Sequence, residues 1–168
     1  FLAEYDRQQK VERGVFYTPN PVVSYMVRAV DSLLQEKFGI AEGLASAEKA
    51  VNPATGKEEH RVQVLDPATG TGTFLQYIIE AIAQKKNPGG QPNPAWERYV
   101  AEELLPRLNG FELMMAPYTV AHMKLGLKLG QTGYQFQNDS RLRVFLTNAL
   151  DKPVKMQEVL LKADYLSR

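Results

Sequence analysis

The residues best suited to chemistry lie between residues 64 and 75, where a carboxylate precedes two closely spaced glycines. An apolar run ends at Asp66, Gly70 and Gly72 follow, and Thr73 opens an amphipathic run. This order predicts a buried strand, a tight turn and a helix, because glycine accepts positive φ and lets a ligand approach the backbone. The start of the helix offers unpaired N–H groups and the positive end of a dipole. We therefore expect a ligand to bind over this turn.

The acid before the glycines indicates what kind of ligand binds there. A phosphate-binding P-loop needs Gly-Lys-Ser/Thr, and a dinucleotide site needs a third glycine; neither follows Gly72. Asp66 would also repel a phosphate, whereas it would attract a positive centre. S-adenosylmethionine has a sulfonium and an α-amino group to face one carboxylate, and ribose hydroxyls for a second. The turn therefore favours S-adenosylmethionine as the ligand.

Two further polar residues follow apolar segments in the same manner. Glu112 ends the segment 108–113, and Asn148 follows the segment 142–146. Strands that alternate with helices predict a parallel sheet, in which ligands bind beyond the carboxyl ends of the strands. We therefore expect Asp66, Glu112 and Asn148 to lie near one another at one sheet edge.

The elements that must position these residues follow from apolar periodicity and helix-capping residues. Asn20 is expected to cap the first helix, with Pro21 at its first position. Residues 1–13 are expected to form a charged arm or helix, 41–50 a short helix, and 52–57 a mobile, turn-rich loop. The tail 154–167 is expected to be helical, although its apolar periodicity is weak. The main predicted strands span 61–66, 108–113 and 142–146, and the main predicted helices span 21–38, 73–86, 95–105 and 117–129.

Four motifs in order resemble those of N6-adenine DNA methyltransferases from restriction–modification systems, in the style of large single-polypeptide enzymes. Asp-Pro-Ala-Thr-Gly-Thr-Gly-Thr-Phe-Leu at 66–75 resembles their cofactor motif. Gly-Val-Phe-Tyr-Thr-Pro at 14–19 is similar to the motif that closes over the methionine end of the cofactor. Gly-Phe-Glu at 110–112 and Leu-Thr-Asn-Ala-Leu at 146–150 resemble the motifs that reach the ribose and the adenine.

The resemblance implies a single domain over residues 1–168, of the doubly wound α/β class. It would be a Rossmann-like S-adenosylmethionine-dependent methyltransferase fold, truncated after about three strands. Asp151 is the alternative to Asn148 as the adenine contact. The residues implied to bind S-adenosyl-L-methionine are Tyr17, Thr18, Pro19, Asp66, Ala68, Thr69, Gly70, Gly72, Thr73, Phe74, Glu112, Leu113 and Asn148.

The catalytic motif of these enzymes, Asn/Asp-Pro-Pro-Tyr/Phe, does not occur in the sequence. Asn-Pro begins at residues 20, 52, 87 and 93 but is never followed by proline. No catalytic residue is assigned, and the chain alone is expected to be inactive. Two alternatives stay open: a methyltransferase of a protein or small molecule, and a non-catalytic cofactor-binding module.

No metal site is predicted either. His60 and His122 lack the spacing of metal ligands, and we place His60 in a loop and His122 on a helix surface. Lys124 and Lys128 share a helix face and are expected to be solvated.

Composition sets limits on partners and location. The chain has 168 residues, 44% hydrophobic and 23% charged, with a net charge of +1 and no cysteine. These values are typical of a globular protein in a reducing compartment, and we expect a cytoplasmic protein that does not enter a membrane. The start at Phe1 suggests a piece of a longer protein. The expected partners are DNA, through the parent protein, and the remainder of the methyltransferase chain; a cut chain would expose apolar strand faces and self-associate.

Overall fold

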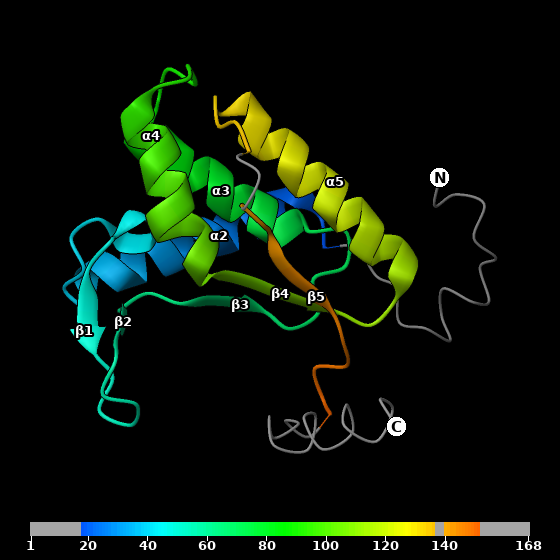
Figure 1. Ribbon diagram of the computed structural model, residues 1–168, viewed down its shortest axis with the longest axis horizontal. Helices are drawn as coiled ribbons and strands as arrows, with labels where there is room; N and C mark the ends of the chain where they lie inside the picture. Colours follow the sequence, from blue (N-terminus) through cyan, green and yellow to red (C-terminus); the bar gives the residue numbers. More distant parts are fainter. Residues whose placement is uncertain (1–17, 137–139, 152–168) are drawn as a thin grey trace, which may run out of the picture.

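A three-stranded parallel sheet forms the centre of the molecule. The computed structural model describes residues 18–136 and 140–151. Its sheet has the order β3 (Val64–Asp66), β4 (Leu108–Glu112) and β5 (Arg143–Leu146) (Figure 1). Asp66 pairs with Gly110, and Glu112 pairs with Leu146. The predicted parallel sheet is therefore confirmed, with strands somewhat shorter than the apolar segments.

Helices α3 (Thr73–Lys86) and α5 (Met115–Gln131) connect these strands. Figure 1 shows both helices on one side of the sheet, where α3 contacts both α5 and α2 (Asn20–Glu36). The second helical layer of a doubly wound fold does not occur among the described residues. That part of the predicted fold class stays a prediction.

The core lies between these helices and the sheet. Leu75, Ile79 and Ile82 of α3 are fully buried, at the i, i+4, i+7 spacing of one helix face. Leu125 and Leu129 of α5 pack into the same cluster. The predicted helix 73–86 is confirmed at both ends.

Helix α2 is confirmed, although its start and its apolar face differ from the prediction. The Pro19 carbonyl accepts hydrogen bonds from the N–H groups of Val22 and Val23, and no side chain caps the helix. Asn20 is therefore its first residue and not its side-chain cap. Most of the predicted apolar face is exposed; Val23 and Val27 are its buried residues.

The predicted helix 95–105 is divided into three turns of different pitch. After α4 (Pro94–Tyr99) come a π-helix, Val100–Leu104, and a 3₁₀ turn, Leu105–Arg107. Pro106 has no N–H to donate to the preceding turn, so a regular α-helix cannot continue through it. At the start of α4, the Asn93 side chain accepts a hydrogen bond from the Trp96 N–H at 2.8 Å.

An antiparallel hairpin, β1 (Lys49–Val51) and β2 (Glu58–His60), was not predicted. The prediction that His60 lies in a loop is therefore wrong. Residues 52–57 do form a turn, closed by hydrogen bonds from the Asn52 and Gly56 N–H groups to the carbonyls of Lys57 and Asn52. Instead of the expected helix within 41–50, the chain forms a single 3₁₀ turn, Gly43–Ala45. Half of the strand residues are charged and most are exposed, so no apolar alternation marks the strands in the sequence.

Candidate functional site

The predicted glycine turn joins the end of β3 to the start of α3, at the edge where β4 also ends. Gly70 and Gly72 have φ of 55° and 81°, in the left-handed region that favours glycine. A Cβ on Gly72 would lie 3.3 Å from the Ala121 Cβ of α5. The second glycine therefore serves both the turn and the close packing of α5.

Glu112 ties this turn to the end of β4. Its side chain is buried, and its Oε2 accepts a hydrogen bond from the Gly70 N–H at 2.8 Å. Its Oε1 accepts one from the Met114 N–H, also at 2.8 Å. Each carboxylate oxygen has a second lone pair, so both oxygens keep acceptor capacity in a fixed orientation.

Asp66 presents an unsatisfied acceptor next to the turn. Its Oδ1 accepts a hydrogen bond from the Ala68 N–H at 3.2 Å. Its Oδ2 is buried, and no donor within the described part of the chain reaches it. Burial raises the pKa of Asp66, the Ala68 hydrogen bond opposes this, and the negative charge of Glu112 raises it further. A buried acceptor without a donor is costly, so the geometry suits a ligand that brings a hydrogen-bond donor or a positive charge.

The remaining turn residues differ in their access to a ligand. Thr69 is buried beneath the turn and Phe74 packs against the core, whereas Ala68 and Leu113 are exposed. Thr73 begins α3, and its Oγ1 lies 3.5 Å from the Lys124 Nζ. Ala68 and Thr69 belong to the turn, Thr73 and Phe74 to the first turn of α3, and Leu113 directly follows β4. Their role as cofactor contacts stays a prediction.

Lys124 and Lys128 contact α3 and are not simply solvated. Partial burial lowers the pKa of Lys124. Lys128 forms an ion pair with Glu80 at 3.2 Å. Both side chains thus link α5 to α3.

Asn148 and Asp151, the two alternatives for the adenine contact, are paired with each other. The Asn148 Nδ2 donates to the Asp151 Oδ1 at 3.0 Å, and the Asn148 Oδ1 accepts from the Leu150 N–H at 3.0 Å. The Thr147 N–H donates to the Glu112 carbonyl, which holds this turn beside β4. Asn148 thus lies beyond the end of β5 as expected; its contact with an adenine stays a prediction.

Thr18 and Pro19, two of the predicted lid residues, are exposed at the start of α2. Tyr17 lies outside the described residues. Their role as a lid stays a prediction.

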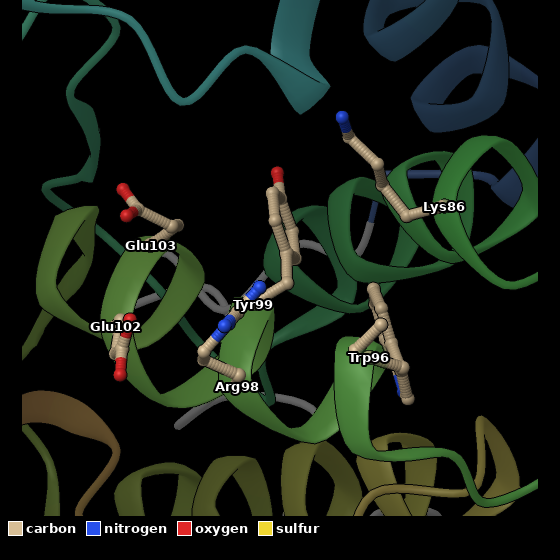
Figure 2. A pocket seen from close by; sticks show the side chains of 7 residues that line it. Lys86, Trp96, Arg98, Tyr99, Glu102 and Glu103 are labelled. Carbon is tan, nitrogen blue, oxygen red and sulfur yellow. The ribbon is translucent and has the colours of Figure 1, made fainter.

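A second candidate site is a cavity of about 270 Å³ at the other end of α3. Its lining includes Lys86, Trp96, Tyr99 and Glu103 (Figure 2). The Lys86 Nζ lies over the Tyr99 ring and pairs with Glu42. This end of α3 is about 20 Å from Thr73, at 1.5 Å per residue. Among the described residues that line the cavity, none has a buried side-chain acceptor without a donor, in contrast to Asp66.

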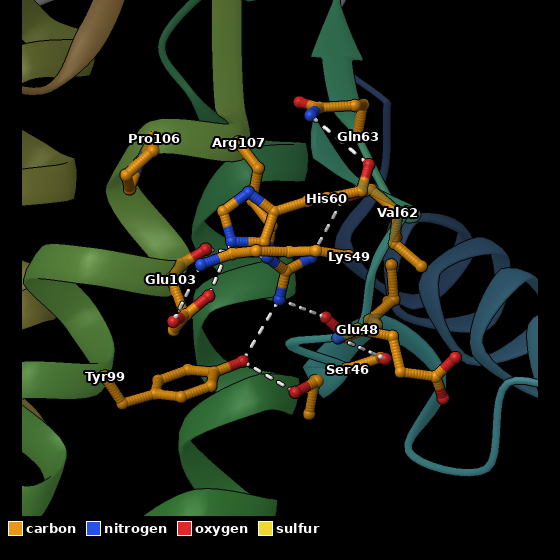
Figure 3. A network of polar contacts seen from close by, with 12 residues as sticks. Ser46, Glu48, Lys49, His60, Val62, Gln63, Tyr99, Glu103, Pro106 and Arg107 are labelled. Atoms are coloured by element: carbon orange, nitrogen blue, oxygen red, sulfur yellow. Dashed lines mark hydrogen bonds and ion pairs between the residues drawn. The ribbon is translucent and has the colours of Figure 1, made fainter. Parts of the chain in front are cut away.

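Beside that cavity, a buried arginine holds several segments together (Figure 3). The Arg107 side chain donates to the carbonyls of Leu44, Val62 and Glu103 and to the Tyr99 hydroxyl. No sequence motif identified Arg107, because its acceptors are main-chain carbonyls of distant segments.

The two histidines have structural contacts. His60 Nε2 lies 2.6 Å from Glu103 Oε2, and Lys49 pairs with the same carboxylate at 3.3 Å. His122 Nε2 lies 3.2 Å from the Val144 carbonyl, and its ring contacts Tyr118. Among the described residues, no group of three His, Cys, Asp or Glu could hold a metal ion, and no helix is long and apolar enough to cross a membrane.

Comparison with protein families gives a match over almost the whole chain. A family described as N-6 DNA Methylase matches residues 1–159. No curated protein matches the chain.

Solved structures that are similar to the chain include three complexes with DNA or a DNA mimic. The DrdV–DNA complex is 28% identical, with a TM-score of 0.62, over 90% of this chain and 12% of that one. A nuclease-deletion mutant of the Type ISP restriction-modification enzyme LlaGI, in complex with a DNA substrate mimic, is 26% identical with a TM-score of 0.50, over 70% of this chain and 9% of that one. The ATP-dependent Type ISP restriction-modification enzyme LlaBIII bound to DNA is 26% identical with a TM-score of 0.51, over 71% of this chain and 7% of that one. The chain thus spans about an eighth or less of the length of these proteins.

Proposed function

The chain belongs to the N-6 DNA methylase family, and from this we propose that it is the S-adenosylmethionine-binding portion of a DNA adenine-N6 methyltransferase of a restriction–modification system. The observation that carries the proposal is the buried Asp66 Oδ2, which has no donor among the described residues and lies beside a left-handed glycine turn.

The charges around the turn suit S-adenosylmethionine better than a phosphate. Asp66 and Glu112 place two carboxylates at one sheet edge, and a bound phosphate would meet both negative charges. The α-amino group of S-adenosylmethionine can donate to the Asp66 carboxylate, one oxygen of which has no donor among the described residues. The ribose hydroxyls can donate to the lone pairs of Glu112 that Gly70 and Met114 leave free.

The remaining contacts of the proposed site follow from exposure. Ala68 and Leu113 are exposed beside the carboxylates, and in the proposed complex Leu113 would contact the adenine ring. Thr18 and Pro19, with Tyr17, would cover the methionine end. Asn148, with its partner Asp151, would lie at the adenine edge.

In the proposed reaction, S-adenosylmethionine supplies an electrophilic methyl group to the exocyclic amino group of an adenine. The residues of this chain bind and orient the methyl donor through Asp66 and Glu112. The sequence has no Asn/Asp-Pro-Pro-aromatic motif to position the amino group, so we propose that the chain alone does not transfer the methyl. DNA binding is proposed for the parent protein, since the three similar structures are all complexes with DNA or a DNA mimic.

Isothermal titration calorimetry of the 168-residue chain with S-adenosylmethionine tests the proposal. We expect saturable one-site binding, weakened at least about tenfold by Asp66→Asn, because the donor loses a charged acceptor. Glu58→Gln is the matched control, since it removes an exposed acid of the hairpin without touching the turn. Absence of binding by the folded wild-type chain, or an equal loss in the control, would contradict the proposal.

A further inference from the structure

Thr69 lies under the glycine turn, where it can shape the turn without covering the ligand. Its exposed fraction is 4%, so it presents almost no surface to a ligand. Its N–H donates to the Phe111 carbonyl of β4 at 2.9 Å. Its hydroxyl donates to the main-chain carbonyl of Asp66 at 3.0 Å. One residue therefore ties the turn to both strands whose ends carry the carboxylates.

The carbonyl of Thr69 continues this scaffold toward α3. It accepts a hydrogen bond from the Gly72 N–H at 2.8 Å. The intervening Gly70 N–H is held by Glu112. The hydrogen bonds that hold the turn are thus made by Thr69 itself and by the N–H groups of Gly70 and Gly72 next to it.

Gly110 of β4 provides the space that Thr69 occupies. A Cβ on Gly110 would lie 2.5 Å from the Thr69 Oγ1 and 3.3 Å from its Cγ2. Gly110 does not have positive φ, so backbone conformation does not require a glycine there. The requirement is steric: the Thr69 Oγ1 makes the shortest contact, and the Leu75 Cδ1 would also lie 3.1 Å from the added Cβ.

We propose that Thr69 is a positioning residue, not a ligand contact: seated on Gly110, it fixes the turn in its binding conformation before the ligand arrives. This inference rests on the proposed function, because the turn is taken as the S-adenosylmethionine site. Ordering the turn in advance removes an entropic cost from binding, so Thr69 contributes affinity without touching the ligand.

The test compares variants that separate the hydroxyl from the shape of the side chain. Thr69→Val keeps the shape and removes the donor, and we expect about tenfold weaker binding of S-adenosylmethionine by calorimetry. Thr69→Ser keeps the donor, and we expect affinity within about threefold of the wild type. Gly110→Ala should weaken binding through its steric conflict with Thr69, although neither residue faces the ligand.

A second measurement distinguishes positioning from a general loss of stability. In the ligand-free chain, Thr69→Val should speed hydrogen exchange at the Gly70 and Gly72 amides while the buried amides of α3 keep their protection. The midpoint of thermal unfolding should fall only modestly, by the loss of the one hydrogen bond to the Asp66 carbonyl, so the global stability that protects α3 is retained.

The outcomes are distinguishable. Equal affinity of Thr69→Val and the wild type, or unchanged exchange at Gly70 and Gly72, overturns the positioning role. Equal losses in the Val and Ser variants that track their melting temperatures overturn it as well. If the wild type does not bind S-adenosylmethionine, the proposed function fails, while the exchange comparison still decides whether Thr69 holds the turn.

Discussion

At the scale of single residues, the site depends on two carboxylates with different surroundings. Glu112 accepts two main-chain hydrogen bonds and is fixed by them. Asp66 has one such bond and one buried oxygen without a donor among the described residues. Glu112 is therefore part of the scaffold of the turn as well as of the proposed site, whereas in our proposal the free oxygen of Asp66 accepts from the ligand.

Asp66→Asn should separate stability from binding. The raised pKa of Asp66 means that its charge is unfavourable in the free folded chain. We expect the variant to melt at the same temperature as the wild type or higher, while it binds S-adenosylmethionine at least about tenfold more weakly. Differential scanning fluorimetry and calorimetry on the same samples measure both effects, and a variant with lower stability and unchanged affinity would contradict this reading.

The pH dependence follows from the same pKa shift. Between the ordinary aspartate pKa of 3.8 and the raised pKa of Asp66, the folded chain holds a proton that the unfolded chain has released. Stability contributed by Asp66 therefore falls as pH rises through this window and is constant above it. Affinity for a cationic donor should do the opposite and rise with pH through the folded pKa. Thermal unfolding and calorimetry at a series of pH values from 4 upward measure both trends. Asp66→Asn should lack the part of each trend that comes from titration of Asp66.

At the scale of elements, the packing of α5 against the glycine turn can be tested at Gly72. Gly72→Ala introduces a Cβ at positive φ and 3.3 Å from Ala121, whereas Gly39→Ala has positive φ with no atom within 4 Å of the new Cβ. In both variants the unfolding free energy should fall by about 1–2 kcal/mol, because alanine is strained in the left-handed conformation. Only Gly72→Ala should lose more unfolding free energy than this, because of its contact with Ala121, and urea unfolding measures the difference. Gly72→Ala should also weaken cofactor binding, which calorimetry measures. Equal losses of unfolding free energy in the two variants would show that packing of α5 against the turn does not require a glycine at position 72.

The buried arginine predicts a different pattern of effects. Arg107→Met would leave the carbonyls of Leu44 and Val62 without their donor, and we expect a loss of at least about 2 kcal/mol in unfolding free energy. Arg98→Met, an exposed position on α4, is the control and should change stability by less than about 0.5 kcal/mol. Urea unfolding measures both, and similar losses in the two variants would contradict the role given to Arg107.

At the scale of the whole molecule, one face of the sheet carries exposed apolar side chains. Strand register places Leu65, Phe111 and Phe145 on the face opposite Gly110, which packs toward α3. Leu65 is 54% exposed and Phe145 is 45% exposed. Parallel sheets are normally covered on both faces, so this face favours association.

We therefore expect the chain to self-associate as its concentration rises, and the double variant Leu65→Thr, Phe145→Thr to reduce the effect. Val51→Thr is the control, because Val51 is 66% exposed, more than either residue of the double variant, but lies on the hairpin and not on the three-stranded sheet. Light scattering across a concentration series measures the mean mass. A wild-type chain that stays monomeric throughout would contradict the expectation.

How far the sequence predicts this molecule depends on the range of the interactions involved. The α3 boundaries, the parallel sheet and the convergence of Asp66 with Glu112 follow from local periodicity and from the order of strands and helices. The hairpin of residues 49–60 and the anchoring by Arg107 depend on contacts between distant segments. The breadth of the exposed face of α2 could not be predicted either, because apolar periodicity does not tell which part of a helix finds a partner.

The most direct test of the central claim, that the glycine turn is the S-adenosylmethionine site, is an amide-resolved NMR titration of the chain with that cofactor. We predict that the Gly70 and Met114 amides, which donate to Glu112, shift together and saturate with one dissociation constant. The Trp96 indole, which lies beside the cavity at the far end of α3, should not move. Shifts confined to Trp96 and its neighbours, or no shifts at saturating cofactor, would contradict the account.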